Sequence, residues 1–134
     1  MNLQLNASIL DNATSIGGEA FSYCTSLTGD LNLKKITTLG DGAFKETHIG
    51  KVLCLGKLSA VPASSFFVWW TNNVNNQYLT EVYLPYECTS IGNAAFGRRS
   101  VLTTIKQYTQ SIDDWIEGQT PTYGDITRVT SFGN

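Results

Sequence analysis

The chain has little charge of either sign and no long hydrophobic run, and each shortage excludes a class of protein. Its 134 residues carry 9 Lys and Arg against 11 Asp and Glu, which gives a formal net charge of -2. A nucleic-acid binder needs a clustered basic face, so we expect no nucleic-acid partner. No apolar run approaches the ~20 residues that cross a bilayer, so we expect no membrane insertion. The N-terminus has no basic residue and no long apolar segment, which predicts that it is not a signal peptide.

Cysteine and histidine are too sparse to build a disulfide framework, a zinc site or a catalytic triad. The three cysteines, Cys24, Cys54 and Cys88, are odd in number and form no CxxC pair, so we expect buried free thiols. The single histidine, His48, belongs to no Ser-His-Asp or HExxH pattern. We therefore predict no catalytic residues, no metal site and no cofactor, and a protein that is not an enzyme.

An internal repeat is the strongest feature that the sequence does contain. In each of four copies an aliphatic residue precedes a phenylalanine by five positions, and glycine follows that aliphatic residue in three of the copies. The phenylalanines are separated by 23, 22 and 30 residues. The long third step predicts a loop insertion at about residues 68–78. The four copies span residues 14–21, 37–44, 59–66 and 89–96.

A second motif, with apolar residues at alternating positions, lies between the copies of the first. Leu79, Val82 and Leu84 show it most clearly, and residues 49–54 repeat the same spacing. Period two over a short stretch indicates a strand with one buried face. The following I-G-x-x-A-F segment suits a tight turn into a short helical or 3₁₀ piece with its aliphatic residue and Phe pointing inward. Pro62 replaces the glycine in the third copy, so we expect that repeat to bend differently.

The pattern L-x-x-V-x-L-P followed by T-S-I-G-x-x-A-F resembles the BspA-type leucine-rich repeat. Residues 79–96 match most closely, and the resemblance covers roughly residues 7–106. It implies an α/β leucine-rich-repeat solenoid with one curved parallel β-sheet, short helical or 3₁₀ returns, and four to five repeats of 22–23 residues. It also implies a bacterial cell-surface or secreted protein, although the lack of a signal peptide in this chain leaves a cytoplasmic location open.

The repeat ends near residue 106, so we divide the chain into a solenoid over residues 1–106 and a C-terminal part over residues 107–134. Residues 111–118 look like a short helix with Ser111 as its N-cap and Gly118 at its end, suited to cover the open end of the sheet. Residues 129–134 echo the T-S-I-G-N of residues 89–93. The C-terminal part is therefore either a cap or the start of a further repeat, and uncovered repeat ends would favour self-association.

Stacked strands place equivalent residues side by side, and this predicts which side chains share the outward face. Lys51 falls between two acidic residues there, so opposite charges can pair across the ladder. The same positions, with Tyr83 as an anchor, can instead contact a partner on an extended face. The two predicted columns are Asp30, Lys51, Glu81 and Thr104, and beside them Asn32, Leu53, Tyr83 and Lys106.

The insertion carries two adjacent tryptophans, Trp69 and Trp70, in an asparagine-rich segment. One interpretation is a contact role, in which they stack on a sugar ring or anchor a protein partner. The other is a packing role, in which they fold back to cover the flank of the solenoid. The leading hypothesis is a non-enzymatic module that binds a protein or a glycan, and its candidate contact residues are Tyr83, Lys51, Glu81, Trp69 and Trp70. The alternatives are a structural spacer in a longer solenoid and carbohydrate binding through the tryptophan loop.

Overall fold

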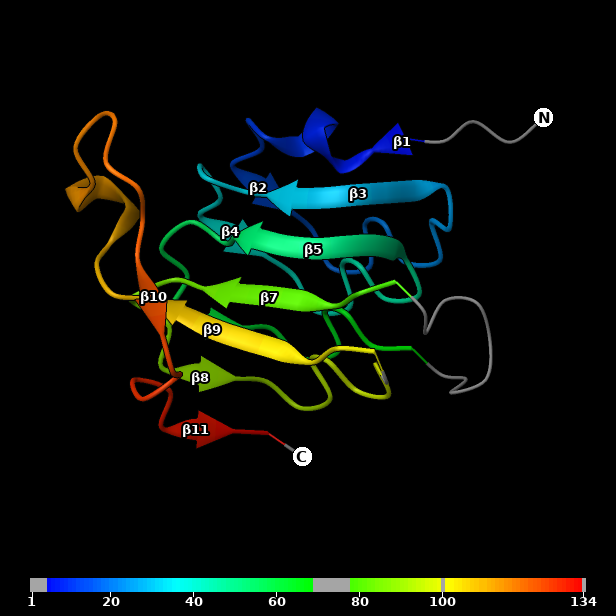
Figure 1. The fold of residues 1–134 in the computed structure, drawn as a ribbon. Helices are drawn as coiled ribbons and strands as arrows, with labels where there is room; N and C mark the ends of the chain where they lie inside the picture. Colours follow the sequence, from blue (N-terminus) through cyan, green and yellow to red (C-terminus); the bar gives the residue numbers. More distant parts are fainter. Residues whose placement is uncertain (1–4, 69–77, 100, 134) are drawn as a thin grey trace.

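The computed structural model describes residues 5–68, 78–99 and 101–133, and it arranges them in two layers of short strands (Figure 1). The larger layer, the main sheet, has six strands in the order β1-β3-β5-β7-β9-β10. Its first five strands pair in parallel, as the sequence predicted, whereas β10 pairs antiparallel with β9. The strands are β1 (Leu5–Asn6), β3 (Leu27–Asn32), β5 (His48–Cys54), β7 (Glu81–Leu84), β9 (Thr104–Tyr108) and β10 (Tyr123–Gly124).

The second layer consists of two separate parallel ladders of two-residue strands. One ladder pairs β2 with β4, and the other has the order β11-β8-β6. Four of these strands contain the aliphatic residue of the first repeat motif, and the fifth contains Phe132 at the equivalent position of the C-terminal echo. The strands are β2 (Ser15–Ile16), β4 (Thr38–Leu39), β6 (Ala60–Val61), β8 (Ser90–Ile91) and β11 (Ser131–Phe132).

The break between the two ladders falls at Pro62, in the repeat that departs from the motif. In the other repeats the glycine N–H bonds back to the aliphatic carbonyl of the preceding copy: Gly40 to Ile16 at 2.9 Å, and Gly92 to Val61 at 2.7 Å. Proline has no N–H to make the equivalent bond. The irregularity expected of the third repeat is therefore a missing backbone hydrogen bond between β4 and β6.

The returns between the layers are turns and not the short helices that the sequence predicted. The described residues contain no α-helix, and their 3₁₀ helices are η1 (Ala7–Leu10) and η3 (Ile112–Asp114). In the A-F segments every second main-chain N–H group bonds to the next repeat, as when Phe21 donates to Ala43 at 2.9 Å and Phe66 to Ala95 at 2.7 Å. Because these N–H groups already donate to the neighbouring repeat, they cannot form the i→i−4 hydrogen bonds of an α-helix.

The core between the layers is built from the predicted apolar positions. Leu79, Val82 and Leu84 are fully buried, which confirms the inward face of the strand motif. The repeat phenylalanines form a continuous stack with ring centroids 5.4–5.6 Å apart and nearly parallel ring planes. Such contacts join successive repeats, because each repeat alone cannot bury its apolar face. The stacked rings are Phe21, Phe44, Phe66 and Phe96.

A buried arginine links three successive repeats. Arg99 is only 5% exposed, and its Nε donates to the carbonyl oxygen of Phe66 at 2.6 Å. Its two terminal nitrogens lie 3.3 Å from the carbonyl oxygen of Thr47. Burial lowers the pKa of Arg99 to about 10, so the side chain is still charged near neutral pH. Its hydrogen bonds satisfy carbonyls in the turns of neighbouring repeats, which buried backbone requires.

The C-terminal segment covers one end of both layers, although not with the expected helix. Residues 111–118 contain only the single turn η3, with Ser111 as the predicted N-cap. The segment then adds β10 to the main sheet and β11 to the second layer, so β11 pairs with β8 in the register that the T-S-I-G echo predicts. The buried Gln107 side chain donates to the carbonyls of Pro85 and Cys88 and fixes β9 to the preceding loop.

Candidate functional site

The outward face of the main sheet brings together three of the residues that the sequence singled out. The strand register places Lys51 beside both Asp30 and Glu81, and Glu81 beside Thr104, which is the first predicted column. The Nζ of Lys51 lies 3.0 Å from Oε2 of Glu81, so the predicted pairing across the ladder forms. This column therefore runs across four neighbouring strands on the face opposite the buried residues.

The second predicted column is correct at one end and wrong at the other. Tyr83 pairs with Lys106 in the register of β7 and β9, as expected. Asn32, however, pairs with Cys54 and not with Leu53, because a register shift lies between Leu31 and Asn32. A strand with one extra residue displaces the neighbours that follow it. Leu53 is therefore not in line with Asn32, as the predicted column required.

Tyr83, Glu81 and Lys51 form one hydrogen-bonded group. The hydroxyl of Tyr83 donates to Oε1 of Glu81 at 2.5 Å, while Lys51 contacts the other carboxylate oxygen. The bond from Tyr83, and then that from Lys51, lowers the pKa of Glu81 below its ordinary value. The same bonds raise the pKa of Tyr83 and of Lys51. At neutral pH the group therefore holds a charged carboxylate between an ammonium group and a neutral phenol.

Two further tyrosines, which the sequence analysis did not single out, extend this group into an aromatic cluster. The ring of Tyr123 in β10 packs edge-on against Tyr83, with centroids 4.8 Å apart. Tyr108 in β9 lies 6.1 Å from Tyr83 and 6.2 Å from Tyr123. Tyr123 is 50% exposed, so the cluster has an accessible aromatic edge. We call Tyr83, Tyr108 and Tyr123 the tyrosine cluster.

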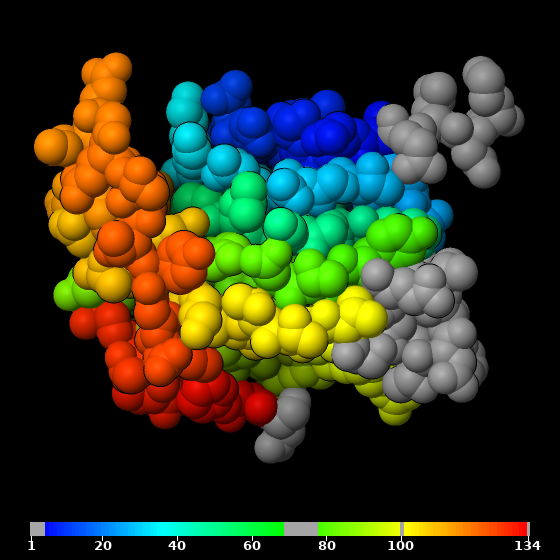
Figure 2. All heavy atoms as spheres, in the orientation of Figure 1, coloured from blue at the N-terminus to red at the C-terminus, as the bar shows by residue number. Residues whose placement is uncertain are grey.

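The tyrosine cluster borders a cleft of about 560 Å³ between the main sheet and the C-terminal segment. Figure 2 shows this segment, in orange, beside the ends of the main-sheet strands. Apolar and aromatic side chains form most of the lining, and burial raises the pKa of Tyr108 to about 12. The Tyr108 hydroxyl is held by a bond to the carbonyl oxygen of Leu53 at 2.7 Å. These lining residues are Leu53, Tyr108, Ile112, Trp115 and Pro121.

Polar groups lie among the apolar lining residues of the cleft. Asn32, Lys34 and Asp113 line it together with Cys54. Asp113 already bonds to Lys57 at 2.6 Å, so its charge is paired. Mostly apolar walls with a few placed polar groups are typical of ligand sites, and the cleft volume falls within their usual range.

The sequence analysis also discussed two tryptophans, one histidine and three cysteines. Trp69 and Trp70 fall outside the described residues. His48 stacks on Tyr78, with ring centroids 4.0 Å apart. Cys54 and Cys88 are buried free thiols, as predicted, and burial raises the pKa of both. The third thiol is half-buried.

The described part of the chain contains neither a metal-binding cluster nor a membrane-spanning helix. Across residues 5–68, 78–99 and 101–133, no group of three or more His, Cys, Asp or Glu side chains is placed to hold a metal ion. In those same ranges, no helix has the length and apolar character needed to cross a bilayer.

The sequence comparisons agree with the repeat pattern. A model of the BspA type leucine rich repeat region matches residues 2–116 in six copies, where the motifs alone had indicated four to five. Comparison with curated proteins and comparison with solved structures each returned no match.

Proposed function

The chain belongs to the BspA-type leucine-rich-repeat family, and on that premise we propose that it is a non-enzymatic module that binds a protein partner through the outward face of the main sheet. In this proposal the stacked repeats are a solenoid segment of a bacterial cell-surface or secreted protein. Repeat proteins commonly bind on such extended sheet faces, because every strand contributes side chains to one continuous surface.

The tyrosine cluster is the observation that carries the proposal. Three tyrosine rings from β7, β9 and β10 lie within 4.8–6.2 Å of one another on a face that also carries the Lys51–Glu81 ion pair. Tyrosine offers a large and rigid contact area at a low cost in conformational entropy, and it is enriched at interface hot spots. The neighbouring charges of both signs would select among partners by electrostatic complementarity.

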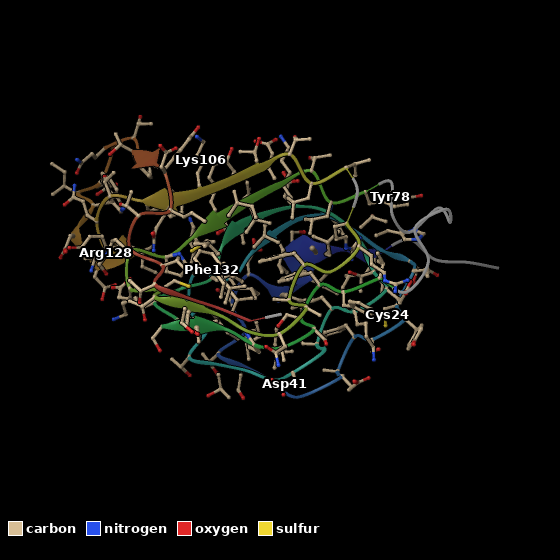
Figure 3. All side chains as sticks on the ribbon, turned by 90° about the horizontal axis from the view of Figure 1, so that it is seen from below. Cys24, Asp41, Tyr78, Lys106, Arg128 and Phe132 are labelled. Atoms are coloured by element: carbon tan, nitrogen blue, oxygen red, sulfur yellow. The ribbon has the colours of Figure 1, made fainter. Side chains whose placement is uncertain are left out.

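A display-library selection against the folded chain tests this proposal. Protein fragments that bind the wild-type chain would be measured again against Tyr83→Ala and Tyr123→Ala, and against Asp41→Ala as a matched control. Asp41 is exposed on the opposite side of the molecule from Lys106 in Figure 3. We expect the tyrosine variants to bind about tenfold more weakly or worse, and the control to bind as the wild type does. Binders that keep their affinity for both tyrosine variants would contradict the proposal.

A structural spacer is the second candidate, and the pairing of β11 favours it. This strand extends the second layer in the register of the repeats, and its Phe132 side chain is exposed at the end of the stack. Leu5 and Ile9 are exposed at the opposite end. Apolar ends and open strand edges favour addition of another repeat or another copy. Light scattering over a concentration series distinguishes the two functions, because growing oligomers support a spacer and a constant monomer refutes self-association through the ends.

A further inference from the structure

The cleft beside the tyrosine cluster lies where three strands of the main sheet end. Asn32 is the last residue of β3, Cys54 of β5 and Tyr108 of β9, and all three line the cleft. The C-terminal segment contributes Ile112 and Trp115 to its walls. Since Tyr108 also belongs to the tyrosine cluster, a protein that lies on the outward face of the main sheet can extend a residue into the cleft.

One charged group in the lining of the cleft has no partner in the described part of the chain. Lys34 forms neither an ion pair nor a side-chain hydrogen bond with residues 5–68, 78–99 or 101–133. The other charged lining residue, Asp113, is paired with Lys57 at 2.6 Å. The lining therefore carries one uncompensated positive charge, which favours an anionic group in the occupant.

The charge of Lys34 also acts on the ends of the strands. Burial raises the pKa of the Cys54 thiol, and of the two charged side chains that act on this thiol, Lys34 lowers the pKa more than Glu87 raises it. Glu87 does not line the cleft. The positive charge therefore outweighs the negative one at the wall that an occupant would contact.

The remaining lining residues suit an apolar side chain and a peptide group. Leu53, Tyr108 and Trp115 offer apolar and aromatic surface, and the Tyr108 ring is fixed because its hydroxyl donates to the carbonyl oxygen of Leu53. A wall that is already positioned costs little conformational entropy when a ligand binds. The side-chain amide of Asn32 forms no hydrogen bond with the described residues. It both donates and accepts, as a peptide group does.

We propose that this cleft binds the C-terminal residue of the protein partner, with its free carboxylate at Lys34 and an apolar side chain against Tyr108 and Trp115. The inference rests on the function proposed above, because the rest of the partner lies on the outward face of the main sheet. A chain end carries a carboxylate, a peptide group and an apolar side chain on one residue, whereas an internal acidic residue does not. Capture of a terminal carboxylate is a recurring mode of peptide recognition, and a cleft of about 560 Å³ has room for a short chain end.

Titration of matched peptides, followed by nuclear magnetic resonance of the ¹⁵N-labelled chain, tests the site directly. The three tryptophans give three indole N–H signals, and the signal lost in Trp115→Phe is that of Trp115. The probes are acetyl-Gly-Gly-Leu and acetyl-Gly-Gly-Phe, each as the free acid and as the C-terminal amide. We expect at least one acid to shift the Trp115 signal in a saturable manner, with a dissociation constant of about 1 mM or tighter. Its amide should bind about fivefold more weakly, because it has no charge to pair with Lys34.

Two lysine variants decide whether Lys34 recognises the carboxylate. In Lys34→Gln we expect the acid to bind no better than its amide, because the variant keeps a polar side chain but loses the charge. Lys35→Gln is the matched control, since Lys35 is the next residue, is also exposed and does not line the cleft. The preference for the acid should therefore persist in the control. Comparing acid with amide in each variant separates the charge pair from any general change in the fold.

Three outcomes would overturn the inference. The first is that no acid shifts the Trp115 signal, or that acid and amide bind equally well. The second is that the preference for the acid survives in Lys34→Gln. The third is that 4-methylpentanoate, which has the carboxylate and the branched end of leucine but no peptide group, binds as tightly as acetyl-Gly-Gly-Leu. That result would assign the cleft to small organic acids.

The same experiments distinguish failure of the cleft from failure of the proposed function. If acid and amide bind equally but the selected protein binders still lose affinity for Tyr83→Ala, the cleft assignment is wrong and the protein-binding face stands. If the binders ignore the tyrosine variants but the acids still depend on Lys34, the proposed face is wrong and the carboxylate site stands.

Discussion

The glycine of the repeat motif is predicted to be indispensable in one copy and replaceable in another. A Cβ atom added at Gly40 would lie 2.2 Å from the main-chain N of Gly18 and 2.7 Å from the carbonyl carbon of Gly17. Real Cβ atoms do not approach backbone this closely, and the backbone of a packed neighbouring repeat cannot rotate away. At Gly17 itself, an added Cβ would meet nothing within 4 Å.

We therefore expect Gly40→Ala to lower the free energy of unfolding by about 3 kcal/mol, the upper part of the range for overpacking. In a chain of this size, that loss lowers the melting temperature by about 10 °C. Gly17→Ala is the matched control, and we expect its unfolding free energy to stay within about 0.5 kcal/mol of the wild type. Urea unfolding followed by circular dichroism measures both. Equal stability of Gly40→Ala and the wild type, or equal losses in the two variants, would refute the close packing of successive turns.

Three further predictions concern backbone strain, the buried arginine and acid pH. Ala94 has a positive φ of 53°, whereas the adjacent Ala95 is buried. In thermal unfolding, Ala94→Gly should therefore be neutral or stabilising and Ala95→Gly destabilising by about 1 kcal/mol. A larger loss of stability in Ala94→Gly than in Ala95→Gly would disprove the strain. Arg99→Ala leaves buried carbonyls unbonded and should cost about 3 kcal/mol in urea unfolding, and a loss below about 1 kcal/mol would show that the repeats do not depend on it. The hydrogen bond from Tyr83 and the neighbouring lysine lower the pKa of Glu81 in the folded state, so its contribution to stability is present above its ordinary pKa of 4.5 and is lost as pH falls through the lowered value. Glu81→Gln should therefore flatten the acid side of a plot of unfolding free energy against pH. An unchanged plot would contradict the pairing.

The repeat pattern predicted the core and much of the outward face, because each repeat adds one strand in a fixed register. Alignment of the motifs placed Lys51 between Asp30 and Glu81, and the paired strands have that register. The same reasoning failed at Leu53, since one extra residue in β5 shifts the pairing without changing the hydrophobic pattern. Motif alignment thus predicts inward positions better than the neighbours of an irregular strand.

The turns and the C-terminal segment were harder to predict, since their structure depends on partners outside the local sequence. The A-F segments have the small residues of a helical turn, but hydrogen bonds to the next repeat hold them open. Residues 111–118 have the capping signals of a helix, yet only η3 forms. Tyr123 was missed because it joins the tyrosine cluster through β10, a two-residue strand outside the repeat.

Radical footprinting of the tyrosines tests the central claim, that the outward face of the main sheet is the contact surface for protein. Tyr123 on that face and Tyr23 on the turns are similarly accessible, at 50% and 57% exposed, so their oxidation without a partner should be comparable. With a binder from the display selection, the account predicts that Tyr123 is protected while Tyr23 is oxidised as before. Protection of Tyr23 with unchanged oxidation of Tyr123 would contradict it and place the contact on the turns.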